Sequence, residues 1–292
     1  MRFYLFLLFL LFASLLKAQQ NTLLWEVSGN GLEKPSYLFG TIHLQDKRVF
    51  CFPDSVKIAF DSCDVLALEI VMDFSNPQEL LSKIMIKDES QSLKNILTKQ
   101  EYKKVKKAVS KNLDPAMILM MDKILPVLIA AELMSSQTHK DEKYPMDLYL
   151  QKQAEKKGKV LYSLESIESQ YTVLEKISIE KQKEELLAVV DSMSVYKTLT
   201  DSMILLYQQQ KIEELYCITN SYNSSFDEAW QEELLDKRNV AMVEKLKEKM
   251  KEGSVFVAVG AGHLPGTTGL VFLLNQAGYR VRPVYSQCTA KP

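Results

Sequence analysis

Short, continuous apolar segments near both ends of the chain constrain the fold more than any other feature of the sequence. Residues 255–259 read VFVAV, and residues 65–70 read VLALEI. A strand that is apolar on both faces belongs in the interior of a sheet that helices cover on each side. Similar segments occur at 160–164 and 279–285. The sequence therefore predicts an α/β protein with a buried central sheet.

The N-terminal region predicts a β-hairpin. Residues 23–27 and 36–42 are apolar segments, and the turn-rich link SGNGLEKP separates them. A link of this composition favours two antiparallel strands. Strand patterns therefore occur at both ends of the chain. We expect them to form one mixed sheet that is built from N- and C-terminal segments and flanked by helices.

The middle of the chain, about 75–250, predicts a large helical insertion. A helix is expected over residues 116–134, with Asp114 as its N-cap and a kink at Pro126. Charged residues in this apolar segment argue against a membrane span. Apolar stripes alternating with Lys and Glu predict two further helical regions, at 181–210 and 227–251.

The first residues, MRFYLFLLFLLFASLLKAQQ, resemble a secretory signal peptide. Arg2 precedes an apolar stretch over residues 3–16, which is short for a membrane span, and the small Ala18 follows. We expect cleavage of residues 1–18, which would leave 19–292 as one exported domain in the periplasm or outside the cell, without a membrane span. An uncleaved N-terminal anchor is the alternative.

Charge and cysteine content narrow the class of protein further. The chain has 36 basic and 37 acidic residues, a net charge of −1, and its lysines alternate with glutamates, so no nucleic-acid partner is expected. In an oxidising compartment four cysteines permit two disulfides in three possible pairings. The C-x-x-C spacing typical of zinc sites is absent from these cysteines, which are Cys51, Cys63, Cys217 and Cys288.

Two of the three histidines occur in the same Gly-x-x-His pattern, each directly after a predicted strand. Gly40 and His43 follow SYLF, and Gly260 and His263 follow VFVAV. A glycine leaves the end of a strand without side-chain bulk, so a ligand or another segment can approach the backbone. Ligand sites in α/β sheets favour the ends of strands. The plainer alternative is two structural histidines at the sheet edge.

Glu69 adds a carboxylate at the end of an otherwise apolar strand. Burying an ionised carboxylate is unfavourable unless a cation, a metal ion or several donors meet it, and a structural salt bridge is one such partner. If His43, Glu69 and His263 converge, they can bind one divalent ion and leave positions open for water and substrate. Mixed nitrogen and oxygen ligands suit manganese, cobalt or zinc.

A basic residue is predicted to pair with Glu69 or with a second carboxylate, Glu165. Arg238 lies on the apolar side of its predicted helix, where it needs an anionic partner. We expect it to orient Glu69 or Glu165, or to bind a carbonyl or carboxylate of the substrate. Asp147, at the start of a predicted helix, is interpreted as an N-cap, and His139 as an exposed loop residue.

Several segments together resemble the TraB/GumN family, which includes the animal Tiki proteins. They are YLFGTIH, VLALE, YPMDLYLQKQAEKKGKVLYSLESIESQ, RN and VFVAVGAGHLPGTTGLVFLLNQAGYRVRPV. The resemblance runs from about residue 23 to 284. It implies a metal-dependent hydrolase that cleaves peptide bonds with manganese or cobalt, and a fold similar to erythromycin esterase-like and ChaN-like proteins. The family's motifs fall on Gly40 with His43, Gly260 with His263, Glu69, Arg238 with Asn239, and Glu165 with Gln170.

The sequence thus leads to the hypothesis of an exported metallohydrolase that acts on a peptide or another small substrate. The expected catalytic residues are His43, Glu69, His263 and Arg238, of which the first three would also hold the metal. Residues expected to contact the substrate are Gly40, Gly260, Asn239 and Glu165. Two alternatives remain, a non-catalytic periplasmic protein that binds a peptide or saccharide, and an envelope protein whose helical part docks a partner.

Overall fold

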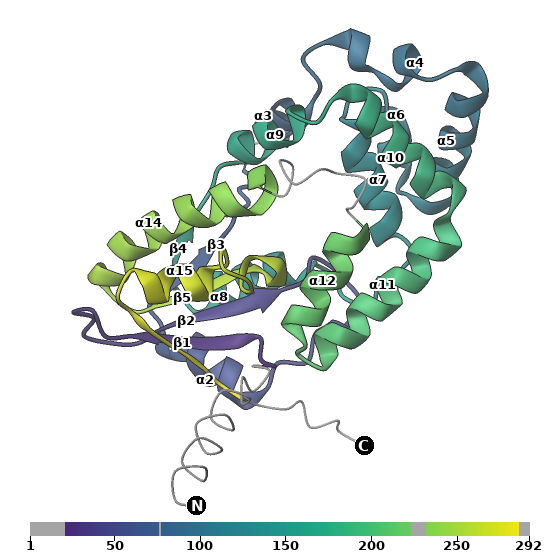
Figure 1. The fold of residues 1–292 in the computed structure, drawn as a ribbon. Helices are drawn as coiled ribbons and strands as arrows, with labels where there is room; N and C mark the ends of the chain where they lie inside the picture. The colour runs from purple at the N-terminus through teal and green to yellow at the C-terminus, as the bar shows by residue number, and fades with distance from the viewer. Residues whose placement is uncertain (1–20, 76, 223–231, 286–292) are drawn as a thin grey trace, which may run out of the picture.

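A mixed β-sheet forms the centre of the molecule (Figure 1). The computed structural model describes residues 21–75, 77–222 and 232–285. Within these residues the sheet has six strands in the order β4-β3-β5-β2-β1-β6. The strands are β1 (Leu24–Ser28), β2 (Ser36–Thr41), β3 (Val65–Leu68), β4 (Val160–Ser163), β5 (Val255–Gly260) and β6 (Arg280–Pro283). The prediction of an α/β protein with a mixed sheet is confirmed.

Strands from opposite ends of the chain are neighbours in this sheet. β5 lies between β3 and β2, and β4, β3, β5 and β2 run parallel to one another. β1 is antiparallel to both β2 and β6, so the predicted hairpin of β1 and β2 is confirmed. Because the four parallel strands share a direction, their carboxyl ends meet at one edge of the sheet.

Helices surround the sheet and also form a separate group beside it. In Figure 1, α4 to α7 and α10 gather at the end of the molecule away from the sheet. The helices are α2 (Asp54–Ser62), α3 (Pro77–Ile84), α4 (Leu93–Ile96), α5 (Lys99–Asn112), α6 (Pro115–Met120), α7 (Pro126–Ser135), α8 (Met146–Lys156), α9 (Ile167–Glu175), α10 (Ile179–Asp191), α11 (Met193–Gln208), α12 (Ile212–Tyr222), α14 (Lys237–Glu252) and α15 (Leu270–Gln276). Short helical turns are η1 (Lys47–Val49), η2 (Glu89–Gln91), the π-helical η4 (Glu232–Asp236) and η5 (Ala261–His263).

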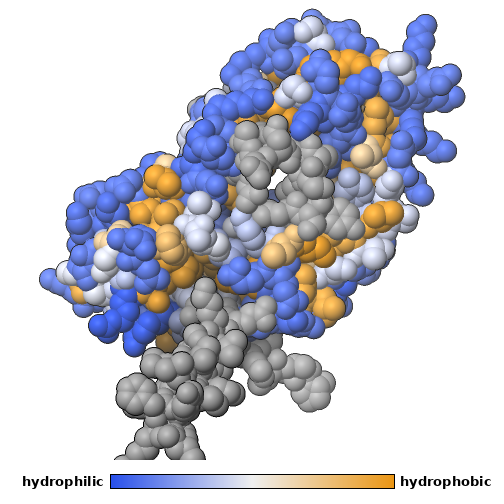
Figure 2. All heavy atoms as spheres, viewed as in Figure 1, coloured by the Kyte–Doolittle hydropathy of each residue, from blue (hydrophilic) through white to orange (hydrophobic). Residues whose placement is uncertain are grey.

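Two hydrophobic clusters hold these layers together. In the sheet cluster, Phe256 of β5 is fully buried, and its ring lies 5.8 Å from that of Phe39 and 5.3 Å from that of Phe60. The second cluster joins α4, α5, α7 and α10 through residues such as Val105, Ile129 and Leu186. Figure 2 shows a mostly hydrophilic face, with hydrophobic residues in small groups. The sheet and the group of helices beside it therefore each have a hydrophobic core of their own.

The predicted helix over residues 116–134 is instead two helices. α6 ends at Met120, and α7 begins at Pro126 after the extended Leu125. A proline fits the first position of a helix, where its missing N–H leaves no bond unmade, and it disfavours a helical conformation in the residue before it. The expectation of a kink at Pro126 is therefore wrong, because the proline starts a new helix.

The two other predicted helical regions are also interrupted. Residues 181–210 divide at Ser192, which separates α10 from α11. In the region 227–251, α14 begins at Lys237 after the π-helical turn η4. The first part of this region, 227–231, lies outside the described residues, as do the predicted signal peptide and its cleavage site. Among the described residues, no helix is long and apolar enough to cross a membrane.

The cysteines do not form the two bridges that their number permits. Cys51 is disulfide-bonded, whereas Cys63 and Cys217 are not part of a disulfide. Cys63 is buried, and burial raises the pKa of its thiol to about 11. Cys288 lies outside the described residues. Cys63 therefore acts as a small buried side chain that is protonated at neutral pH.

Candidate functional site

Four polar side chains come from the carboxyl ends of the four parallel strands. Along the edge, from β4 to β2, they are Glu165, Glu69, His263 and His43. The backbone N–H of Glu165 donates to the carbonyl of Glu69 at 2.7 Å, and Thr41 lies opposite Gly260 in the sheet. The order of the strands therefore brings residues from both ends of the chain to one edge.

Glu69 is the centre of this group, and both of its oxygens are bonded. Oε1 accepts from the backbone N–H of Gly260 at 2.8 Å and lies 3.7 Å from Nε2 of His263. Oε2 accepts from Nη2 of Arg238 at 2.8 Å and from Nε2 of Gln170 at 3.2 Å. Burial favours the neutral acid, but His263, Arg238 and the Gly260 N–H outweigh it and hold the pKa of Glu69 far below its ordinary value.

Arg238 bridges Glu69 and Glu165. Its Nη2 donates to Oε2 of Glu165 at 2.6 Å, its Nε donates to Oε1 of Glu165 at 2.9 Å, and its Nη1 donates to the carbonyl of Leu234 at 2.9 Å. Only 15% of the Arg238 side chain is exposed. Burial lowers the pKa of the guanidinium, but hydrogen bonds and charges from both carboxylates raise it overall. The arginine therefore stays charged and fixes both acids.

His263 is buried and is oriented by Asn239. Its Nδ1 lies 2.6 Å from Oδ1 of Asn239, whose Nδ2 donates to the carbonyl of Thr268 at 2.8 Å. The Thr268 carbonyl can only accept, so it fixes the amide with its oxygen toward the ring. Nδ1 of His263 therefore carries the proton, and Nε2 faces Glu69. Asn239 is itself buried, and these contacts take up its side chain.

His43 is exposed and is held by a residue that sequence reasoning did not place in the site. Its side chain is 76% exposed, and its Nδ1 donates to Oδ2 of Asp147 at 3.0 Å. Oδ1 of Asp147 accepts from the hydroxyl of Thr41 at 2.5 Å. The hydrogen bond to Asp147 raises the pKa of His43, and the charges of Asp147, Glu69 and Glu132 add to the increase.

The interpretation of Asp147 as an N-cap is wrong. Pro145 is the N-cap of α8, and Asp147 is the second residue of the helix. An aspartate at a helix start is usually satisfied by backbone N–H groups, but here the carboxylate reaches Thr41 and His43 in another segment. Two features of the sequence could have indicated this contact. Asp147 lies in the YPMD segment, and the GTIH motif contains a threonine, Thr41, that can donate to a carboxylate.

The first glycine of each Gly-x-x-His motif is required by close packing at the strand end. A Cβ on Gly40 would lie 3.1 Å from the Cα of Ala261 and 3.0 Å from Leu264. A Cβ on Gly260 would lie 3.3 Å from Oε1 of Glu69. The missing side chains therefore let the turn η5 rest against β2 and let Glu69 reach a backbone N–H.

The donor set has the chemistry of a site for a divalent ion. Both rings use Nδ1 to donate to an oxygen, which leaves Nε2 as the ligand atom, and such a second contact is typical of metal-binding histidines. Glu69 offers a carboxylate beside one of them. Within the part of the chain that the structure describes, however, no three His, Cys, Asp or Glu side chains are grouped so as to hold a metal ion. His263 and Glu69 are together, and His43 pairs with Asp147 instead.

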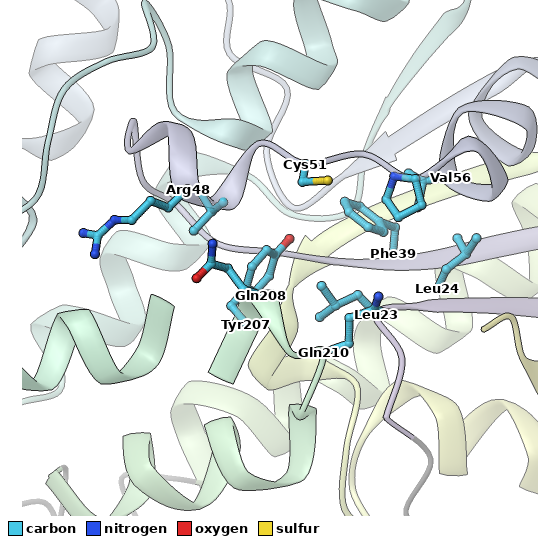
Figure 3. Close-up of a pocket in the computed structure, with 11 residues that line it drawn as sticks. Leu23, Leu24, Phe39, Arg48, Cys51, Val56, Tyr207, Gln208 and Gln210 are labelled. Carbon is cyan, nitrogen blue, oxygen red and sulfur yellow. The ribbon is translucent and has the colours of Figure 1, made fainter. Parts of the chain in front are cut away.

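A separate pocket lies beside β1 and β2 (Figure 3). It is mostly apolar, and Phe39, Val56 and Tyr207 are among its lining residues. The Tyr207 hydroxyl donates to the carbonyl of Gly40 at 2.8 Å, so this tyrosine supports the strand that leads to His43. The pocket contains none of the predicted site residues.

Comparison with known proteins places this chain in a family. The family profile described as TraB/PrgY/gumN matches residues 23–283. The chain is 24% identical to a protein of Xenopus tropicalis named metalloprotease TIKI1, over 91% of this chain and 62% of that protein. It is 24% identical to metalloprotease TIKI2 of Danio rerio, over 89% and 60%, and 23% identical to human metalloprotease TIKI1, over 91% and 63%.

The chain spans about three-fifths of the length of these curated relatives. No solved structure matches it at a significant level, so the expected similarity to erythromycin esterase-like and ChaN-like folds stays a prediction. The family profile covers nearly all of the described chain, including both glycine–histidine motifs, Glu69 and Arg238. The chain belongs to the TraB/PrgY/gumN family.

Proposed function

We propose that the chain is an exported metal-dependent hydrolase that cleaves peptide bonds at the carboxyl edge of its parallel strands. The main support is the set of side chains at this edge, where a buried histidine faces a carboxylate that stays ionised. Relatives at about 24% identity are named metalloproteases, which agrees with this proposal. The resemblance to the Tiki proteins favours manganese or cobalt as the ion, and zinc also suits mixed nitrogen and oxygen ligands.

Each residue of the set has a role that follows from its contacts. His43, Glu69 and His263 would hold the ion, which when bound lowers the pKa of a water and polarises a carbonyl. Arg238 and the Gly260 N–H keep Glu69 ionised and oriented. His43 is the exposed member of the set, and it is therefore the one that a substrate can reach directly.

Metal-dependent peptide cleavage by the full chain tests the proposal. The purified protein is stripped of metal and assayed on a peptide library with manganese, cobalt or zinc added. Turnover should return with one of these ions and should be lost in His43→Ala and His263→Ala. His139→Ala is the matched control because His139 is exposed and remote from both motifs in the sequence. Full activity in either of the first two variants would refute the assigned roles.

A non-catalytic binding protein is the second candidate function. The observation in its favour is that, among the described residues, three metal-binding side chains do not converge on one point. This candidate predicts stoichiometric binding of a peptide or saccharide that is unaffected by a chelator and yields no product. Calorimetry with and without chelator, followed by mass spectrometry of the ligand, separates it from the hydrolase.

Export is part of the proposal and has its own test. The apolar N-terminal segment supports cleavage after Ala18. Expression of the full sequence in a bacterial host should give a mature protein that begins at Gln19 and is recovered outside the cytoplasm. An intact N-terminus in the membrane fraction would instead favour the uncleaved anchor.

A further inference from the structure

In each histidine of the two motifs, Nδ1 lies within hydrogen-bond distance of one side chain on a different helix. We propose that Asp147 and Asn239 are positioning residues that hold His43 and His263 as the same tautomer, with the proton on Nδ1 and the lone pair on Nε2. The inference deepens the proposed function. The tautomer itself is argued from the contacts, and only its purpose, which is to offer Nε2 to a metal ion, rests on the proposed function. It extends the site by Asp147 and Thr41, and it gives Asn239 a role other than contact with the substrate.

The contacts of Asp147 leave one arrangement of protons at His43. An ionised carboxylate only accepts hydrogen bonds, so both groups that approach Asp147 must donate. These are the hydroxyl of Thr41, 2.5 Å from Oδ1, and Nδ1 of His43, 3.0 Å from Oδ2. Thr41 thereby turns the carboxylate so that its second oxygen faces the ring. Thr41 and His43 are two residues apart in one motif, so a single aspartate aligns both.

Asn239 produces the same result at His263 without a charge. Its amide nitrogen is committed to the carbonyl of Thr268, so its oxygen must face the ring and accept from Nδ1. A neutral partner suits this place because both Asn239 and His263 are buried, and a further buried carboxylate would need a cation of its own. The exposed ring of His43 has the anionic partner instead.

The two positioning residues occupy similar places in their helices. Asp147 is the second residue of α8, and Asn239 is the third residue of α14. Side chains in a helix tilt toward its N-terminus, so residues in the first turn can reach beyond the end of the helix. Each helix start therefore holds one ring by a short, rigid connection.

Nitrogen NMR of the metal-free full chain tests the inference directly. With three histidines in the sequence, the ring signals can be assigned from single variants. Spectra are recorded at about pH 9, well above the ordinary imidazole pKa of about 6.5. We expect the ring shifts of His43 and His263 to show a proton on Nδ1, whereas the exposed His139 should show the mixture that is usual in water.

The Asp147→Ala variant should return His43 to that mixture and leave His263 unchanged. Thr41→Val should cause a smaller shift in the same direction because Asp147 stays but loses its alignment. The matched control is Asp141→Ala, which removes an equal charge that contacts the same loop at the N–H of Lys47 and does not touch His43. Asn239→Leu, which keeps the volume but removes the acceptor, should shift His263 alone.

Metal titration by calorimetry supplies the second readout. Loss of a residue that orients a ligand lowers metal affinity about 10–100-fold, so Asp147→Ala should show this decrease and Asp141→Ala should not. A proton on Nε2 of His43 in the unaltered chain, or an unchanged His43 signal in Asp147→Ala, would overturn the inference. If the tautomers are as expected but the unaltered chain binds none of the three ions, the positioning roles stand and the proposed metallohydrolase fails.

Discussion

At the scale of single residues, the site depends on how Arg238 separates two like charges. Glu69 and Glu165 follow the adjacent strands β3 and β4, and both bond to the same guanidinium group. Without it, two carboxylates would share a partly buried place, where the repulsion between them is weakly screened. The planar guanidinium has donors enough to meet both acids. Arg238 is therefore first a structural requirement of the site, whatever it also does for a substrate.

Removing this cation should destabilise the fold strongly. Arg238→Met keeps an apolar stem but leaves the two carboxylates without the cation that they share, and breaking a buried ion pair in this way costs about 3–5 kcal/mol. Combining it with Glu165→Gln removes one of the charges, so the double variant should be more stable than Arg238→Met alone. Urea unfolding measures the free energy of each variant. If the double variant loses the sum of what Arg238→Met and Glu165→Gln each lose, the repulsion between the two carboxylates is absent.

Neutralising Glu69 should affect function more than stability. Glu69→Gln keeps the shape and the acceptor for the Gly260 N–H, but it removes the charge that a metal ion or a proton transfer requires. We expect kcat/KM for peptide cleavage to fall at least about 100-fold, the lower end of what a positioned acid or base contributes. Glu168→Gln is the control because Glu168 is an exposed glutamate that pairs with Lys83 and makes no contact with Glu69 that the structure shows. Equal activities in the two variants would remove Glu69 from the site.

At the scale of elements, the ends of β2 and β5 must approach each other closely to place their histidines. Gly40 of β2 packs against Ala261 in the turn that leads to His263. The loop after His43 is fixed in turn by Asp46, whose buried carboxylate accepts from Nε and Nη2 of Arg48 at 2.9 and 2.7 Å. Each motif is thus supported by contacts outside its own strand.

A methyl group at position 40 should disturb this approach. In Gly40→Ala the added Cβ would lie 3.1 Å from backbone and side-chain atoms of Ala261, which can move only with the turn that carries them. Overpacking of this kind costs typically about 1–3 kcal/mol, measurable by urea unfolding. Gly253→Ala is the control, because its backbone is extended and an added Cβ would lie 3.9 Å from the Asp64 carboxylate, an ordinary contact distance. A Gly40→Ala variant as stable as this control would contradict the packing argument.

Acid should weaken the loop after β2 through Asp46. Hydrogen bonds from Arg48 lower the pKa of Asp46 from 3.8 to about 2, so its ionised form stabilises the folded state. This contribution is complete above about pH 5 and is lost as the pH falls through about 2, and a shift of this size corresponds to about 2 kcal/mol. Asp46→Asn should lack this part of the acid dependence. If the free energies of unfolding of the unaltered chain and of Asp46→Asn change with pH in the same way over this range, Asp46 does not make this contribution.

At the scale of the whole molecule, the site exists because the chain folds both of its ends into one sheet. Local patterns were enough to predict the strands, the hairpin and the two glycine–histidine motifs, because each depends on a short run of residues. The breaks at Ser192 and before Pro126 were not predicted, because the apolar stripe continues in the sequence where the backbone changes direction. Asp147 was interpreted as an N-cap for a related reason, because its local sequence is that of a helix start.

That misreading shows where the limit lies. Asp147 is separated from His43 by 104 residues, and the pattern around it is that of an ordinary helix start. The pairing of Glu69 with Arg238, 169 residues apart, was within reach only because each residue broke the pattern of its own element. Residues that conflict with their local surroundings could be identified from sequence, and those that fit locally could not.

The most direct test of the central claim is the position of a bound metal ion in crystals of the full mature chain soaked in manganese. Anomalous scattering locates such an ion independently of any assumed ligands. The account predicts one strong peak at the carboxyl edge of β2, β5 and β3, in contact with Nε2 of His263 and the carboxylate of Glu69, and with His43 turned toward it. A peak elsewhere on the molecule, or none at an edge that the crystal leaves open, would contradict it.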